Sequence, residues 1–461
     1  MRLRTNYLLI FLSVIVLMFC CEAPQLPDSP LDALKIIVPR EANRAVSFTN
    51  KEAAYYYTQT HKSDHPEHTW FEGMNVAKNR VFGGYQLFAD DNELDNQKAE
   101  ATVYPYKLVR DHDGVIEELW MLDTLNIIEV SLTGADQTIG IALKGQGITL
   151  KSQTNTFAFF SSMEGNFSIA VSTKTFHPIQ AKDNILSAEA EAGGFYIGVA
   201  KTDAEAEAMV RETQQNIVSL KGERVQRMER FLERRVPIES NLDSLDLAMS
   251  WLYITTDQLV TKQQGDGIYA GLPWFNEYWG RDEFISFPGA ILVSGQSETG
   301  KKILKSFAEY QDKDKTSKYF GRVPNIVNPS KIDYHTTDGT PRFVIELQNY
   351  VKYFADTSLI RELYPVVVNS IDGALKNWVD AKGYLLHEDN ETWMDARDAN
   401  LVSYSPRGTR ANDIQALWHG QLKAGVYFAA YMGDSVNQKK WNTLAEKLKS
   451  GLFSLVRRSA R

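Results

Sequence analysis

The chain has 461 residues, of which 43% are hydrophobic and 23% charged, and its formal net charge is −8 at pH 7. This balance is typical of a globular protein with room for two domains, and the acidic charge argues against nucleic acid or another polyanion as a partner. The two cysteines, Cys20 and Cys21, lie near the N-terminus. The body of the chain therefore has no disulfide and no thiolate metal site.

Residues 1–21 have the features of an export signal. Arg2 and Arg4 precede an apolar run over 7–19, and a proline-rich polar segment follows. The run is too short for an ordinary membrane span, and the order of charged, apolar and polar segments is that of a signal peptide.

A cysteine at the end of such a signal is typical of a bacterial lipoprotein. We predict lipidation at Cys21, because the small residue Cys20 precedes it, whereas Cys20 itself follows a bulky Phe. Cys20 is the alternative site, and an ordinary cleaved signal is the alternative interpretation. We expect an exported protein, anchored by lipid to a bacterial membrane on its periplasmic or cell-surface side, with 22–34 as a linker.

Residues 35–200 alternate between apolar and small or polar residues with the period of a β-strand. Two such apolar sets are Ile128, Val130, Leu132 and Phe167, Ile169, Val171. Turn sequences such as Asp113-Gly114 separate these segments. The pattern predicts an N-terminal antiparallel β-sandwich domain.

Three histidines, His61, His65 and His68, lie close together among acidic residues. Their irregular spacing in a polar segment favours solvated side chains over a metal site. We predict no metal and no other cofactor.

Residues 201–239 are predicted to form a helical linker. Ala, Glu, Gln and Arg dominate the stretch 204–235, Gly222 is a point where the helix could break, and Pro237 marks a boundary.

From residue 240 to 461 the apolar period is helical. The long loops 265–281, 313–337 and 381–409 carry polar and aromatic residues and are expected to form the functional face. Seven helices are predicted, at 243–264, 282–294, 297–312, 338–354, 357–379, 410–432 and 435–458.

The first long loop carries Trp274, Trp279 and Arg281, and Asp282 begins the predicted helix that follows. Aromatic rings stack on the C–H face of a pyranose, and a guanidinium and a carboxylate hydrogen-bond to its hydroxyls. This density predicts a sugar site. The alternative is a buried Arg-Asp pair beside core aromatic residues.

Gly-Leu-Pro-Trp-Phe at 271–275 and Trp-Gly-Arg-Asp at 279–282 closely resemble the glycogen debranching enzyme family in its amylo-α-1,6-glucosidase domain. Thr-Trp-Met-Asp-Ala at 392–396, Pro-Arg-Gly at 406–408 and Ile-Gln-Ala-Leu-Trp at 414–418 extend the resemblance. It covers the chain from about Leu242. It implies an (α/α)6 toroid around a sugar pocket, and hydrolysis by two carboxyl groups with inversion at the anomeric carbon.

The resemblance implies that Asp395 is the general acid. Trp393 and Met394 would give it an apolar setting that raises its pKa, and a helix cap is the alternative role. The substrate-binding residues that the resemblance implies are Arg281 and Asp282 on the nonreducing glucose, Trp274, Trp279 and Trp393 for stacking, Asp338 as a sugar contact or a cap, and Arg407, Asp413 and Trp418. Where this chain has Asp413 and Gln415, family members commonly have Glu and Asn, which leaves substrate detail open.

The catalytic base of the family is a Glu near the end of a toroid of about twelve helices. Since the sequence ends at Arg461 after seven predicted helices, we expect an incomplete toroid that lacks the base. Its unpaired face would expose Trp418, Leu422, Val426 and Phe428. A substitute base among Glu346, Glu388 and Glu391 is the alternative.

These features predict a glycoside hydrolase that removes α-1,6-linked glucose from a branched α-glucan. One alternative is a trehalase or another exo-α-glucosidase of the same toroid fold. The other is a catalytically incomplete, sugar-binding surface lipoprotein. The expected partners are an α-glucan or oligosaccharide and the membrane that holds the lipid anchor.

Overall fold

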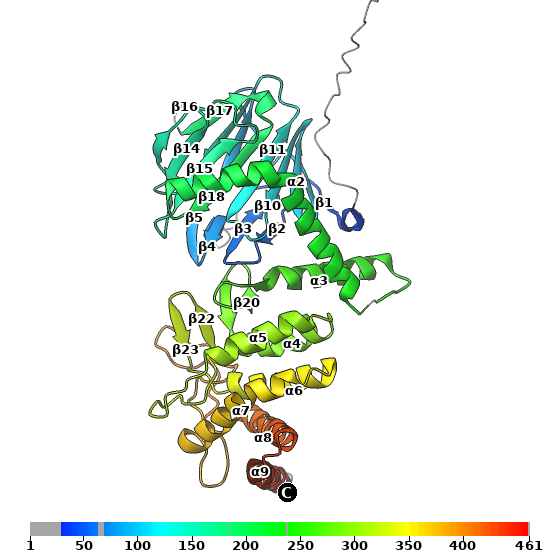
Figure 1. Cartoon of the computed structure of the whole chain (residues 1–461), viewed down its shortest axis with the longest axis vertical. Coiled ribbons are helices and arrows are strands. Elements are labelled where there is room, and N and C mark those ends of the chain that lie inside the picture. Colours follow the sequence, from blue (N-terminus) through cyan, green and yellow to red (C-terminus); the bar gives the residue numbers. More distant parts are fainter. Residues whose placement is uncertain (1–28, 63–68, 183, 237, 460–461) are drawn as a thin grey trace, which may run out of the picture.

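The fold was analysed in a computed structural model, which describes residues 29–459 except 63–68, 183 and 237. Figure 1 shows a β-rich region, a long helix that leaves it, and a stack of helices that ends with the C-terminus. The predicted export signal, Cys20, Cys21, His65 and His68 lie outside the described residues.

The N-terminal region is antiparallel throughout. A nine-stranded sheet has the order β1-β8-β9-β10-β11-β18-β15-β14-β13, and smaller sheets have the orders β16-β17-β12-β6-β7 and β2-β3-β4-β5. The strands are β1 Ile36–Val38, β2 Ala45–Thr49, β3 Ala54–Gln59, β4 Gly73–Val76, β5 Asn79–Phe82, β6 Tyr85–Ala89, β7 Asn92–Glu93, β8 Glu100–Val103, β9 Lys107–His112, β10 Val115–Met121, β11 Ile127–Thr133, β12 Thr138–Leu143, β13 Leu150–Gln153, β14 Phe157–Ser161, β15 Ser168–Thr173, β16 Gln180–Lys182, β17 Ile185–Glu189 and β18 Gly194–Ala200. The one-turn helices η1 Pro30–Leu34 and η2 Ala190–Ala192 precede β1 and β18, respectively.

The alternation predicted from the sequence decides which face of the large sheet each residue occupies. Ile128, Val130 and Ile169 lie in the core that the sheets share, whereas Ile127 and Ala170 lie in a second cluster on the other face. Both faces of the middle strands are therefore buried.

Helix α2, Asp203–Arg234, covers that second face. It begins with a capping box between Thr202 and Glu205 and packs Ala206 and Val210 against the sheet. The helix is continuous through Gly222, so the predicted division there is wrong, although Figure 1 shows that the helix bends between the sheet and α3.

The rest of the chain is helical with one small sheet. Its elements are α3 Asp243–Leu259, β19 Val260–Thr261, β20 Gly267–Gly271, β21 Phe275–Trp279, α4 Gly280–Phe287, η3 Pro288–Leu292, α5 Ser297–Glu309, β22 Ile326–Asn328, β23 Lys331–Asp333, α6 Gly339–Phe354, α7 Ser358–Asn377, α8 Asn412–Met432 and α9 Ser435–Ser459. The seven predicted helices are confirmed with small shifts. The first ends at Leu259 rather than 264, because β19 pairs with β20.

Helices α4, α6 and α8 follow one another through the core, and α5, α7 and α9 pack beside them. Trp418, Leu422 and Phe428 of α8 are buried in this core, with Trp441 of α9. The expectation that these residues expose an unpaired apolar face is wrong, since α6, α7 and α9 cover α8. A membrane crossing requires a longer apolar helix than any that the described residues form.

An ion-pair network joins the two regions. Asp257 of α3 pairs with Lys51 of the β region and with Arg227 of α2, and Asp123 of the β region pairs with Arg224 and Arg227. Burial lowers the pKa of Lys51 to about 8 in spite of Asp257. The network fixes the helical region against the β region through α2.

Candidate functional site

The predicted site residues come together at the first turns of α4 and α6. Arg281 is the second residue of α4 and is 5% exposed. Its Nε donates a 2.7 Å hydrogen bond to Oδ2 of Asp338, and its Nη1 donates one of 2.8 Å to Oδ2 of Asp395. One guanidinium thus joins carboxylates from two other loops. These three residues, Arg281, Asp338 and Asp395, are called the Arg281 cluster.

Asp338 immediately precedes α6 and is 1% exposed. Its side chain makes no capping hydrogen bond to the helix, so the capping alternative for this residue is wrong. Burial raises the pKa of Asp338 more than the ion pair with Arg281 lowers it. The carboxylate therefore depends on Arg281 for its charge.

The environment of the Asp395 carboxylate differs from the apolar one predicted from the sequence. Its side chain is 31% exposed and lies against the guanidinium of Arg281, whereas Trp393, which was expected to shield it, is 55% exposed. The predicted apolar environment is wrong because the partner of this carboxylate is a cation from another loop.

Asp282 is exposed beside this cluster. Partial burial raises its pKa, Arg281 opposes this shift, and the nearby carboxylate of Asp395 adds to it.

Several buried polar atoms in and beside the Arg281 cluster have no hydrogen-bond partner: Arg281 Nη2, Asp338 Oδ1, Arg342 Nε and Asn325 Nδ2. Buried polar groups in proteins are almost always paired. A polar ligand that entered the cluster would supply the missing partners.

The loop after α7 brings in a second pair. Arg407 donates a 2.7 Å hydrogen bond from Nη2 to Asp413 and contacts the sulfur of Met394, the neighbour of Asp395. Asp389 accepts from the backbone amide of Arg407 at 2.6 Å. The structure thus places Arg407 and Asp413 together, beside the segment that carries Asp395.

The predicted tryptophans do not all lie here. Trp279 immediately precedes α4 and donates to Glu277. Trp274 lies at the end of the β20–β21 hairpin, edge-on to Phe71 of the β region at 6.3 Å between ring centroids. Trp418 is 1% exposed and donates to the carbonyl of Gly383, so the structure assigns it to the core rather than to a sugar surface.

The sequence analysis missed two residues that hold the cluster. Asn325 accepts from the amide of Gly280 through its carbonyl and from the amide of Arg281 through Oδ1. Arg342 lies one turn after Asp338 on α6 and acts on its pKa. The spacing of four residues on a helix is the one signal that could have identified Arg342.

The three glutamates considered as a substitute base differ in their exposure and in their hydrogen-bond partners. Glu391 is 2% exposed and accepts hydrogen bonds from Arg322 and Thr337, so its oxygens are occupied. Glu346 is buried on α6, where burial raises its pKa. Glu388 is exposed, 4.0 Å from Lys318.

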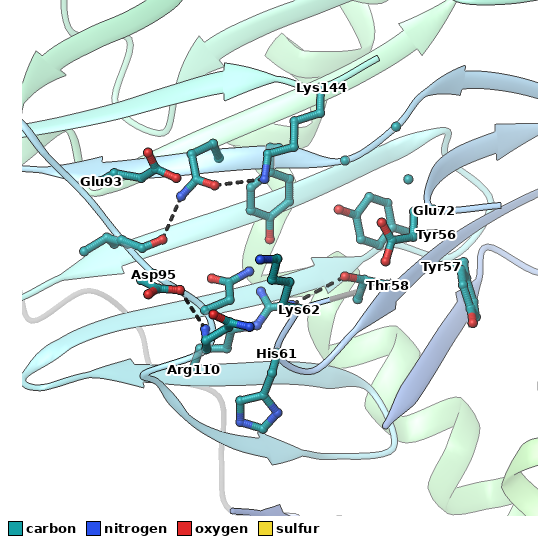
Figure 2. Close-up of a pocket in the computed structure, with 18 residues that line it drawn as sticks. Tyr56, Tyr57, Thr58, His61, Lys62, Glu72, Glu93, Asp95, Arg110 and Lys144 are labelled. Atoms are coloured by element: carbon teal, nitrogen blue, oxygen red, sulfur yellow. Dashed lines mark hydrogen bonds between the residues drawn. The ribbon is translucent and has the colours of Figure 1, made fainter. Parts of the chain in front are cut away.

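A separate polar cavity of about 480 Å³ lies in the β region (Figure 2), and all of its lining residues belong to that region. Arg110, one of the lining residues, is 2% exposed and pairs with Glu117 at 2.7 Å. His61 also lines the cavity and is 6% exposed, with a pKa lowered by burial. The expectation that His61 is solvated is therefore wrong. Among the described residues, no group of three His, Cys, Asp or Glu side chains could hold a metal ion.

Residues 251–455, which include the whole Arg281 cluster, match the protein family described as "Amylo-alpha-1,6-glucosidase". This part of the chain is therefore similar to that family. The match points to a glycosidase-type enzyme. The glycogen debranching enzyme of Saccharomyces cerevisiae is 29% identical to it over 130 residues, which cover 25% of this chain and 8% of the yeast protein.

Two solved structures have weaker similarity to the whole chain. A rhamnosidase from Klebsiella oxytoca with rhamnose bound has a TM-score of 0.35 and 11% identity, covering 91% of this chain and 71% of the other. A sialidase has a TM-score of 0.32 and 9% identity, with 88% and 36% covered.

Proposed function

We propose that the protein hydrolyses α-1,6-linked glucose from a branched α-glucan with inversion. The observation that carries the proposal is the cluster in which Arg281 joins Asp338 and Asp395, inside the region that matches the amylo-alpha-1,6-glucosidase family. In this proposal Arg281, Asp282 and Asp338 bind the hydroxyls of the terminal glucose. The unpaired atoms of Arg281 and Asp338 support that assignment.

Asp395 would protonate the leaving glycosidic oxygen, while a second carboxylate about 6.5–9.5 Å away activates water. For Asp395 to carry that proton, the sugar must take over the hydrogen bond that Arg281 makes to it. Contacts of this kind often form fully only in the complex with substrate. The arrangement of α3 to α9 into an (α/α)6 toroid, with the starts of α4 and α6 facing the sugar, is part of the proposal.

A sugar-binding protein without turnover is the second candidate. It is favoured by the pairing of Asp395 with Arg281 and by the full occupation of Glu391. A trehalase or another exo-α-glucosidase would use the same cluster. We further propose that the protein is exported and anchored by a lipid on Cys21, which the order of charge, apolar run and cysteine in residues 1–21 supports.

The experiment compares the wild type with Asp395→Asn on branched limit dextrin, trehalose and maltose, and follows the released anomer by NMR. We expect β-glucose from the dextrin and a fall in kcat of about 10²–10⁴-fold in the variant. Asp372→Asn is the matched control, because this exposed carboxylate lies on α7 and pairs with Lys440. Near-wild-type kcat in Asp395→Asn would remove Asp395 from the role. Binding without release of glucose would favour the second candidate.

A further inference from the structure

Strand β21 has two chemically different faces. Asn276 and Tyr278 are 6% and 0% exposed and point into the protein, where they bond to Tyr55 and Thr261. Phe275 and Trp279 lie on the opposite face because side chains alternate along a strand. Phe275 is 53% exposed.

The aromatic rings continue beyond the strand, although Phe71 and Trp279 are partly buried. Phe275 and Trp279 stand edge-on with their centroids 5.9 Å apart, and Trp274 at the hairpin end stands edge-on to Phe71 at 6.3 Å. Trp274 is 47% exposed. These four residues, Phe71, Trp274, Phe275 and Trp279, are called the aromatic row. It runs from the β region to the residue that precedes Gly280 and Arg281.

Polar groups border the row. Glu277 projects on the same face as Phe275 and Trp279 and bonds to Lys78 of the β region and to Asn328, each at 2.5 Å. Trp279 donates to its other oxygen. A surface of rings with hydrogen-bonding groups at its edge matches the two faces of a glucan chain, which has apolar C–H faces and a rim of hydroxyls.

We propose that the aromatic row binds the glucan chain beyond the first sugar that follows the glucose held by Arg281, with Phe71 contributed by the β region. This rests on the proposed function, since it takes the Arg281 cluster as the end of the substrate site. Exposed apolar patches of this kind mark binding surfaces. Trp279 ends β21 two residues before Arg281, so the row leads along the chain to the Arg281 cluster, and this selects the substrate chain as its ligand.

The test uses Phe275→Ala and Phe71→Ala, with Tyr353→Ala as the control. Tyr353 is 50% exposed and lies about 22 Å along α6 from the end at Asp338. We expect each row variant to raise KM for branched limit dextrin by about 10-fold, which corresponds to ~1.4 kcal/mol. Its kcat, and both constants for isomaltose, should stay as in the wild type and in Tyr353→Ala.

Unchanged KM for the dextrin, or an equal loss on dextrin and isomaltose, would overturn the proposal. If the wild type hydrolyses neither substrate, calorimetric titration with maltoheptaose separates the two questions. Binding that Phe275→Ala weakens about 10-fold would then support the row while the proposed function fails, and equal binding would overturn the row. A change from dimer to monomer in Phe275→Ala on size-exclusion chromatography would instead identify the row as a contact between two copies of the chain, which also overturns it.

Discussion

The two ion pairs of Arg281 should differ in strength because they differ in burial. Asp338 is 1% exposed, whereas the side chain of Asp395 is 31% exposed. A hydrogen bond to a charged group contributes about 1.5–3 kcal/mol in a buried setting, and a solvated pair contributes about 1 kcal/mol or less. We expect a coupling energy of about 2 kcal/mol between Arg281 and Asp338, and less than about 1 kcal/mol between Arg281 and Asp395.

Removing the guanidinium should cost more than either coupling. Arg281→Met leaves Asp338 buried without a cation, which typically costs about 3–5 kcal/mol. Burial already raises the pKa of Asp338, so without Arg281 this carboxyl should take up a proton more readily. The loss of stability in Arg281→Met should therefore be smaller at about pH 5 than at about pH 8, because proton uptake by the folded state stabilises it as pH falls.

Double-mutant cycles with Arg281→Met, Asp338→Asn and Asp395→Asn measure these energies directly. Unfolding in urea, followed by the circular dichroism of the helices, gives the free energy of each variant. Equal couplings for the two carboxylates, or two couplings below about 0.5 kcal/mol, would refute the assignment of Asp338 as the main partner of Arg281.

Two further predictions concern a buried acid and the proposed lipid anchor. Glu283 is 1% exposed, and burial raises its pKa well above the usual value. Since the unfolded chain releases this proton above about pH 4.3, stability should fall as pH rises from there toward the folded pKa, and Glu283→Gln should lose this slope in urea midpoints between about pH 5 and pH 8. Equal slopes in both proteins would contradict this. Cys21→Ser should abolish incorporation of labelled palmitate in a bacterial host and Cys20→Ser should not; label retained by Cys21→Ser would exclude lipidation at Cys21.

Sequence patterns predicted the helices well because each has a clear apolar stripe and a clear end. The helix predicted to start at 297 begins at Ser297 and ends at Glu309, three residues early. The larger error, at 260–264, arose because the predicted helix was continued past Leu259, although Val260 and Thr261 are β-branched residues that favour a strand. In the structure Val260 pairs with Ile268 and Thr261 pairs with Gly267. Such pairing between strands cannot be predicted from a helical period of apolar residues.

The site was predictable residue by residue but not as an arrangement. Arg281, Asp338 and Asp395 were each selected by motif, yet the bonds that join them span 57 and 114 positions in the chain. Local sequence likewise does not say on which side of a hairpin or helix a ring lies. Trp274 therefore turned out to contact the β region, and Trp418 lies in the core.

The position of Arg281 depends on the β region through the strand that precedes it. Tyr55 of the β region accepts a 2.7 Å hydrogen bond from Asn276, and Lys78 pairs with Glu277. The next residues of the strand lead into α4, where Asn325 holds the amides of Gly280 and Arg281. Asn276 and Glu277 lie within six residues of Arg281 in the chain. A displacement of the β region would therefore move β21, and with it the guanidinium that donates to Asp338 and Asp395. The β region is thus a support for the candidate site as well as a neighbour of the helices.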